Sequence, residues 1–236
     1  MKAKKLTILT GIAILALITN ARAQVLESPL RSGQWAKFSV SEDGIYKIDY
    51  NLFRSAGFDP DKIDPRNISL YGNGSGMLPQ ANSDTGFNHL QEIAITVVGE
   101  SDGKFNPGDY ILFYGQNPDK HSYDIDKGTF RYEKNLFTEK NYYFITISTY
   151  RGKRITNNET LVGDFPIINT FNDFVFHEKE KYNDLKSGRK WFGEQFEISS
   201  DLSLPYTVEG VAVNSQIKIV SSVMSQNLNP ASFRLR

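Results

Sequence analysis

The 236-residue chain can form one large domain or two modest ones, and it is long enough to bury a hydrophobic core. Aromatic residues make up 13% of the chain, with 16 Phe and 12 Tyr, and this composition predicts a mainly β protein because aromatic rings suit half-buried strands. Basic and acidic residues balance at 27 each, which argues against a nucleic acid partner, and the lack of cysteine excludes disulfides and a thiol nucleophile within these residues.

Residues 1–23 have the three parts of a Sec-type signal peptide. They begin with lysines, continue with an apolar run at residues 6–18, and end with small residues at Ala21 and Ala23, so cleavage is expected before Gln24. A membrane anchor is the alternative, but the run is shorter than the roughly 20 apolar residues that span a bilayer. Removal of residues 1–23 takes the basic count from 27 to 23 against 27 acidic residues, a net charge of −4. We therefore expect an exported, mildly acidic protein.

Residues 24–157 are predicted to form an N-terminal β-rich domain. Alternating stretches at residues 35–40 and 45–50 flank an Asp-Gly turn and predict a hairpin, and residues 50–57 predict a short helix that ends at Gly57. Further strands are predicted at residues 67–71, 93–98, 109–114, 130–135 and 140–148. We expect 93–98 and 109–114 to pair through a long loop as a buried hairpin.

Residues 158–236 are predicted to begin a second β-sandwich-like domain. Aromatic density falls around residues 155–163, which marks the boundary, and strand-like stretches follow at residues 206–210, 216–220 and 231–236. A sandwich needs about seven strands, so we expect this domain to be incomplete and the sequence to be a fragment. The expected fold class is mainly β: two β-sandwich-like modules with one or two short helices, the second module truncated.

The acidic loop before the strand at 109–114 is the main candidate for ligand binding. Glu100, Asp102, Asn106 and Asp109 offer oxygen ligands in a glycine-containing loop, as calcium sites do. The spacing departs from the 12-residue calcium loop, and Asp-Gly and Pro-Gly are common turn formers, so a structural turn is the competing interpretation. We expect no other metal or cofactor.

The other motifs are weaker evidence for a binding or catalytic site. The glycines at residues 72–76 lack the Lys-Ser/Thr that completes a phosphate-binding loop. His89, His121 and His177 lack metal-ligand spacing, and no GxSxG elbow is present. Stacking of a sugar on Trp35 or Trp191 is an alternative interpretation of these exposed-type aromatic residues.

Six groups of residues share their order and spacing with a known family over most of the chain after residue 23. They are Gly44-Ile-Tyr-Lys-Ile48; Ile68-Ser-Leu-Tyr-Gly72 with Leu78-Pro79; Gln91-Glu-Ile-Ala-Ile95; Asp102-Gly-Lys-Phe105 with Asp109-Tyr-Ile-Leu-Phe-Tyr-Gly115; Asn141-Tyr-Tyr-Phe144; and Ser187-Gly-Arg-Lys-Trp-Phe-Gly-Glu194. Together they resemble the N-terminal region of the type IX secretion system sortases of Bacteroidetes, which are PorU-type, gingipain-like cysteine peptidases of the C25 family.

The resemblance implies a non-catalytic β-rich region of a cell-surface enzyme. In that family a downstream caspase-like domain carries a His-Cys pair, removes C-terminal sorting signals from secreted cargo and attaches the cargo to lipopolysaccharide. The resemblance also implies that the protein is peripheral to the outer membrane and that a PorV-type β-barrel partner holds it there. The chain departs from the family in having no cysteine, so no catalytic residue is carried over. The alternative function is a stand-alone exported β-sandwich module that binds glycans.

Overall fold

The computed structural model describes residues 28–79, 81, 83, 89–157, 160–183, 186, 191–196, 201–226 and 228–236. The predicted signal peptide, residues 1–23, lies outside these ranges. Contacts divide the chain into unit 1, which comprises Met1–Pro118 and Thr138–Asn157, and unit 2, which comprises Asp119–Phe137 and Asn158–Arg236. Unit 2 thus takes in a short segment that interrupts unit 1 in sequence.

The protein is mainly β, as its composition predicts. The described residues hold nine strands in three antiparallel sheets, with one short α-helix and four single turns of 3-10 helix. None of the helices in the described ranges is long and apolar enough to cross a membrane.

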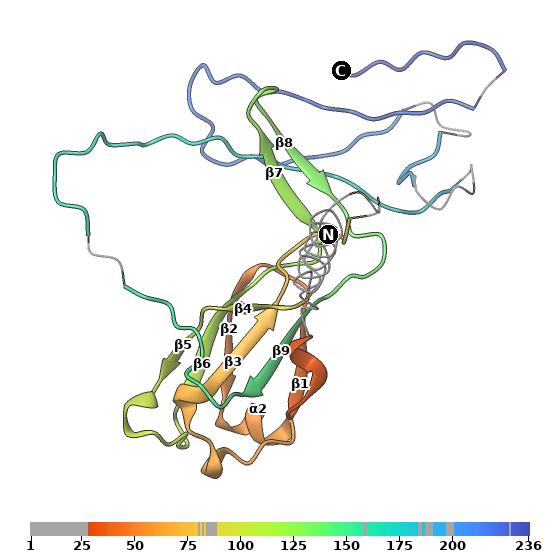
Figure 1. The fold of residues 1–236 in the computed structure, drawn as a ribbon. Coiled ribbons are helices and arrows are strands. Elements are labelled where there is room, and N and C mark those ends of the chain that lie inside the picture. Colours follow the sequence, from red (N-terminus) through yellow and green to blue (C-terminus); the bar gives the residue numbers. More distant parts are fainter. Residues whose placement is uncertain are drawn as a thin grey trace, which may run out of the picture. The chain divides into compact units, whose positions relative to one another are not determined.

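Unit 1 is a sandwich-like pair of sheets (Figure 1). The four-stranded sheet has the order β1 (Trp35–Val40), β9 (Asn141–Ile147), β3 (Ile68–Gly72) and β4 (Gln91–Ile93). The three-stranded sheet has the order β2 (Gly44–Asp49), β6 (Tyr110–Gly115) and β5 (Thr96–Val98). Both sheets contribute to one apolar core, whose fully buried side chains include Leu70 and Ile145 from the first sheet and Ile111 from the second. The inward-facing apolar side chains of the two sheets therefore form one hydrophobic core, as in other pairs of packed sheets.

The predicted hairpin at the Asp-Gly turn is wrong. β1 pairs with β9, and β2 pairs with β6, so residues 41–43 turn a corner between the two sheets. The predicted strand at residues 93–98 divides in the same way, because β4 joins β3 while β5 joins β6. A turn motif fixes where a chain reverses, but the long-range burial of apolar faces decides which strands become partners. The predicted pairing of residues 93–98 with 109–114 is confirmed for β5 and β6.

A short helix closes one end of the unit 1 core. Helix α2 (Tyr50–Ser55) begins at Asp49, whose Oδ1 accepts a hydrogen bond from the Leu52 backbone N–H at 3.0 Å. Gly57, just beyond its end, has a φ of +90°, which confirms its predicted role as a C-terminal cap. Phe53 is fully buried, and its ring centroid lies 5.4 Å from that of Phe105. The helix thus anchors the chain that leads to 3-10 turns η2 (Pro60–Lys62) and η3 (Pro65–Asn67).

Unit 2 contains the third sheet, a hairpin of β7 (Lys120–Asp124) and β8 (Thr129–Glu133). β8 matches the strand predicted at residues 130–135, whereas no strand was predicted for the residues of β7. Beyond residue 157 the described residues form an isolated antiparallel bridge between Tyr182 and Phe192. The stretches 206–210, 216–220 and 231–236 are not paired as strands. An alternating pattern produces a strand only where a neighbouring strand accepts its backbone hydrogen bonds.

Candidate functional site

The acidic turn, residues 99–109, connects β5 to β6 and includes the 3-10 turn η4 (Glu100–Asp102). Asp102 accepts hydrogen bonds from the Lys104 backbone N–H at 3.0 Å and from the Asn106 side-chain amide at 3.0 Å. Asp109 accepts one from the Asn106 backbone N–H at 2.7 Å. The structure therefore brings Asp102, Asn106 and Asp109 into one network of turn hydrogen bonds.

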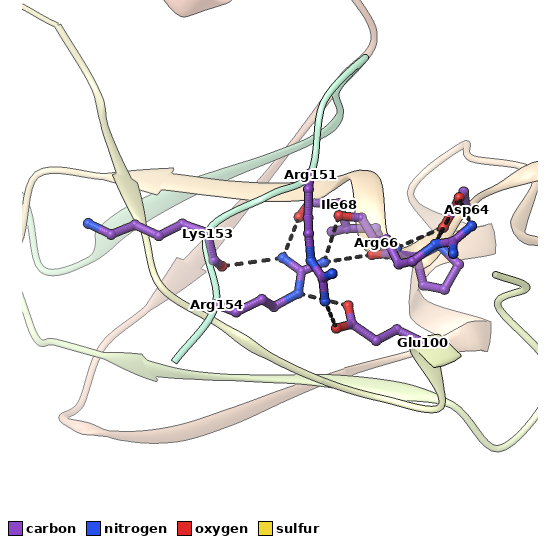
Figure 2. Close-up of polar contacts among 8 residues, drawn as sticks. Asp64, Arg66, Ile68, Glu100, Arg151, Lys153 and Arg154 are labelled. Carbon is purple, nitrogen blue, oxygen red and sulfur yellow. Dashed lines mark hydrogen bonds and ion pairs between the residues drawn. The ribbon is translucent and has the colours of Figure 1, made fainter. Parts of the chain in front are cut away.

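Glu100, the fourth calcium candidate, points instead at two arginines (Figure 2). Its Oε2 accepts a hydrogen bond from Arg154 Nε at 2.8 Å, and its Oε1 accepts one from Arg151 Nη2 at 2.9 Å. The side chains of Glu100 and Arg154 are 19% and 14% exposed, whereas that of Arg151 is 66% exposed. The Glu100–Arg154 pair is thus largely shielded from water, and the Arg151 pair is not.

The Arg154 guanidinium donates five hydrogen bonds, which uses every donor that it has. Besides Glu100, it contacts four backbone carbonyl oxygens: those of Ile68 at 3.1 Å and Lys153 at 3.2 Å through Nη1, and those of Pro65 at 2.8 Å and Arg66 at 3.0 Å through Nη2 (Figure 2). These bonds satisfy carbonyls at η3 and the start of β3. We call this arrangement the arginine clasp; it ties the acidic turn to the other sheet.

The exit segment, residues 150–155, carries Arg154 and leads out of unit 1. Its backbone bonds to the residues that precede β3 and β5: Gly152 N–H donates to the Arg66 carbonyl at 2.9 Å, and Ile155 N–H donates to the Ile95 carbonyl at 2.9 Å. A Cβ on Gly152 would lie 2.0 Å from the Ile68 carbonyl oxygen, so this position requires glycine. The clasp and these bonds close the sandwich where the chain leaves it.

The arrangement of the acidic turn bears directly on the calcium prediction. Both oxygens of Glu100 lie on guanidinium groups, and Asp102 and Asp109 accept N–H hydrogen bonds from the turn itself. In the part of the chain that the structure describes, no three His, Asp or Glu side chains form a group that could hold a metal ion. Calcium would have to compete with these internal bonds, and its binding stays a prediction.

The two tryptophans differ in their surroundings. Trp35 donates its indole N–H to the Ser32 carbonyl at 2.7 Å and packs edge-on against Tyr71, with ring centroids 5.3 Å apart. Trp191 is 41% exposed. Residues on both sides of Trp191 in the sequence, among them Tyr182, Glu194 and Phe196, line a cavity of about 270 Å³ in unit 2. Of the two, Trp191 is the more exposed.

Each of the three histidines lies on a different segment of the chain. His89 precedes β4, and His121 lies on β7. His177 is hydrogen-bonded to Glu194 through Nε2 at 2.8 Å, and Lys179 Nζ lies 3.9 Å from the same carboxylate.

Sequence reasoning missed the arginine clasp. No role was predicted for Arg154, and its partner Glu100 lies 54 residues earlier. The one available signal was charge complementarity, since two arginines beside a glycine follow an acidic loop in the same domain. That signal does not select a partner, because many acidic residues fit it equally well.

Comparisons with known proteins give a weak likeness to a solved structure. No family model and no curated protein sequence matches this chain. Among solved structures, the chain is similar to the crystal structure of dimeric latent PorU from Porphyromonas gingivalis, with a TM-score of 0.42 and 23% identity. The likeness covers 56% of this chain and 11% of that chain. The part of PorU that this chain matches is therefore about a tenth of the PorU chain.

Proposed function

We propose that this chain is a non-catalytic, N-terminal part of a type IX secretion sortase of the PorU type. In this proposal, a downstream C25-like cysteine peptidase domain removes C-terminal sorting signals from secreted cargo and attaches the cargo to lipopolysaccharide. The role of the present residues is to support that domain at the outer surface of the outer membrane. A PorV-type β-barrel would hold the protein there as a peripheral component.

The proposal rests on where the residues that resemble the sortase family lie in unit 1. Gly44–Ile48 belongs to β2, Ile68–Gly72 is β3, and Asn141–Phe144 belongs to β9. Asp109–Gly115 includes all of β6, and Phe105 of the acidic motif is buried at 1% exposure. The resemblance is therefore carried by strands and core contacts, as expected for a supporting domain without a reaction centre of its own.

Two experiments test the proposal at different levels. The coding sequence after the Arg236 codon should continue into a C25-like peptidase with a catalytic His-Cys pair; an immediate stop codon and no such frame would refute it. Separately, residues 24–236 carrying an affinity tag should retain a PorV-type barrel from detergent-solubilised outer membranes, and the same membranes lacking the barrel serve as the control. Failure to retain the barrel would refute the proposed anchoring while leaving the gene-level test intact.

Binding of glycans is the second candidate function, and the exposed ring of Trp191 is the feature that favours it. Tryptophan fluorescence should shift on addition of the oligosaccharide part of lipopolysaccharide, and Trp191→Ala should abolish the shift while Trp35→Phe should not. An unchanged spectrum up to millimolar sugar would count against this function.

A further inference from the structure

The β7–β8 hairpin of unit 2 has one aromatic face and one polar face. The strand register pairs His121 with Tyr132 and Tyr123 with Phe130, and the ring centroids of these pairs lie 5.1 and 5.0 Å apart. Directly opposite residues share a face, so the four rings lie on one side of the hairpin. The alternate positions form the other side and are all polar: Lys120, Ser122, Asp124, Thr129, Arg131 and Glu133. A two-stranded hairpin is marginally stable at best by itself, so a cover on its aromatic face stabilises it.

Residues 174–176, with the sequence Phe-Val-Phe, cover this aromatic face, and we call them the docking segment. Phe174 stacks on Phe130 with ring centroids 4.4 Å apart, and Phe176 stacks on Tyr132 at 4.0 Å. Two rings that lie two residues apart on the docking segment thus meet two rings that lie two residues apart on β8. This spacing is that of extended chains, in which alternate side chains point to the same side. The hairpin face therefore fits an extended segment with an aromatic residue at every second position.

Further contacts within unit 2 fit this arrangement. The ring of His121, on β7, lies 5.3 Å from the ring of Phe174 and 5.3 Å from that of Phe176. Val175, between the two stacked positions, is 52% exposed, as expected for a side chain that points away from the hairpin. At the turn between β7 and β8, the Lys127 carbonyl accepts a hydrogen bond from Lys218 Nζ. The chain beyond residue 157 thus contacts the hairpin at its aromatic face and at its turn.

The covalent path from the hairpin to the docking segment is long. The hairpin lies between β6 and β9 in the sequence, so the chain continues into unit 1 from both of its ends. Just before the hairpin, Asn117 bonds to Asp43 through its backbone N–H at 2.9 Å and through its side-chain amide at 2.7 Å, which fixes this part of the chain within unit 1. Residues 160–173, which lead to the docking segment, form no helix or strand and are all exposed. The ring contacts are therefore a direct link that bypasses this exposed stretch.

We propose that the β7–β8 hairpin is a docking element that recognises the Phe-x-Phe segment at residues 174–176 and holds the chain beyond residue 173 without need of the covalent connection. The occupant of the hairpin is the docking segment of the same copy of the chain. Stacked aromatic pairs contribute affinity beyond the area that they bury. An intact connection adds only an effective concentration, on the order of millimolar for a short flexible linker. The hold should therefore survive a cut within residues 160–173 and should depend on the stacked rings.

Cleavage of the exposed stretch in residues 24–236 tests the proposal. Residues 165–171 are replaced by the recognition sequence of a site-specific protease, and the cut protein is analysed by size exclusion at micromolar concentration with and without denaturant. The two fragments should elute together at the mass of one uncut chain and should separate in denaturant. Separation without denaturant would overturn the proposal. Elution at twice that mass would show that the docking segment is seated on a second copy, which would overturn its assignment to the same chain.

A matched pair of variants in the cleavable protein isolates the stacked rings. Phe176→Ala removes one stacked pair and should weaken retention of the C-terminal fragment by about tenfold or more, whereas Val175→Ala, at the exposed position beside it, should leave retention unchanged. Hydrogen exchange of the cut Phe176→Ala protein should show loss of protection in β7 and β8, because the hairpin has lost its cover, while β6 and β9 keep their protection and show that unit 1 is folded. Equal retention in the two variants would overturn the proposal.

Discussion

Replacement of Arg154 by methionine tests whether the arginine clasp stabilises unit 1. Methionine keeps an unbranched apolar side chain but removes all five donors, which leaves the shielded Glu100 carboxylate without its nearer cation and takes one hydrogen bond from each of four carbonyls. Removing one partner of a buried ion pair costs about 3–5 kcal/mol. Because Glu100 is 19% exposed and keeps Arg151, we expect a loss near the lower end, about 3 kcal/mol in the free energy of unfolding.

The matched control is Arg151→Met. It removes an arginine from the same carboxylate, but the Arg151 side chain is 66% exposed, so its loss should cost about 0.5 kcal/mol or less. Urea unfolding followed by Trp35 fluorescence measures both, in a Trp191→Phe background that leaves one tryptophan, in unit 1. Adding Glu100→Gln to Arg154→Met should recover part of the loss, because it removes the unpaired charge. Equal costs for the two arginine variants would refute the argument from burial.

Three further predictions concern unit 1. Gly152→Ala should destabilise it by about 2 kcal/mol or more, because the new Cβ meets the Ile68 carbonyl, whereas Gly44→Ala, whose Cβ would meet nothing closer than 3.9 Å, should change the urea midpoint little. Millimolar calcium should not raise the melting temperature, given the internal bonds of the acidic turn; a rise reversed by a chelator would establish the site instead. Burial raises the pKa of Tyr143, so this tyrosine should ionise later than the exposed tyrosines when tyrosinate absorbance is titrated. The folded state holds this proton more tightly, so stability should fall as the pH rises beyond about 10, and ionisation in step with the exposed tyrosines would contradict the burial argument.

Local structure was largely predictable from the sequence, whereas strand partners were not. The ends of α2 followed from an Asp cap and a glycine, because both act within one turn of the chain. The strands β3, β6 and β9 followed from short apolar runs. The sheet order depends on contacts such as Trp35 with Thr146, more than a hundred residues apart, and no short-range pattern encodes them.

The candidate site shows the same division. The acidic turn was recognisable, because Asp102-Gly103 and Pro107-Gly108 form turns by themselves. The partner of Glu100 was not recognisable, since its choice of Arg154 depends on where η3 and the exit segment meet in the folded domain. The β7–β8 hairpin was predicted only in part, because β7 reads Lys-His-Ser-Tyr-Asp, which resembles a polar loop; its His121 ring packs against Phe174 and Phe176, about 50 residues later in the chain.

The exit segment also determines how unit 1 would respond to a pull from the chain that follows it. A load applied beyond Ile155 first reaches the hydrogen bond from Ile155 to Ile95 and then Arg154 and Gly152, whose bonds run to η3, β3 and the acidic turn together. These bonds must yield as a group before the load reaches the end of β9. The clasp therefore bears the load first, and it protects β9 from separating from its sheet one hydrogen bond at a time.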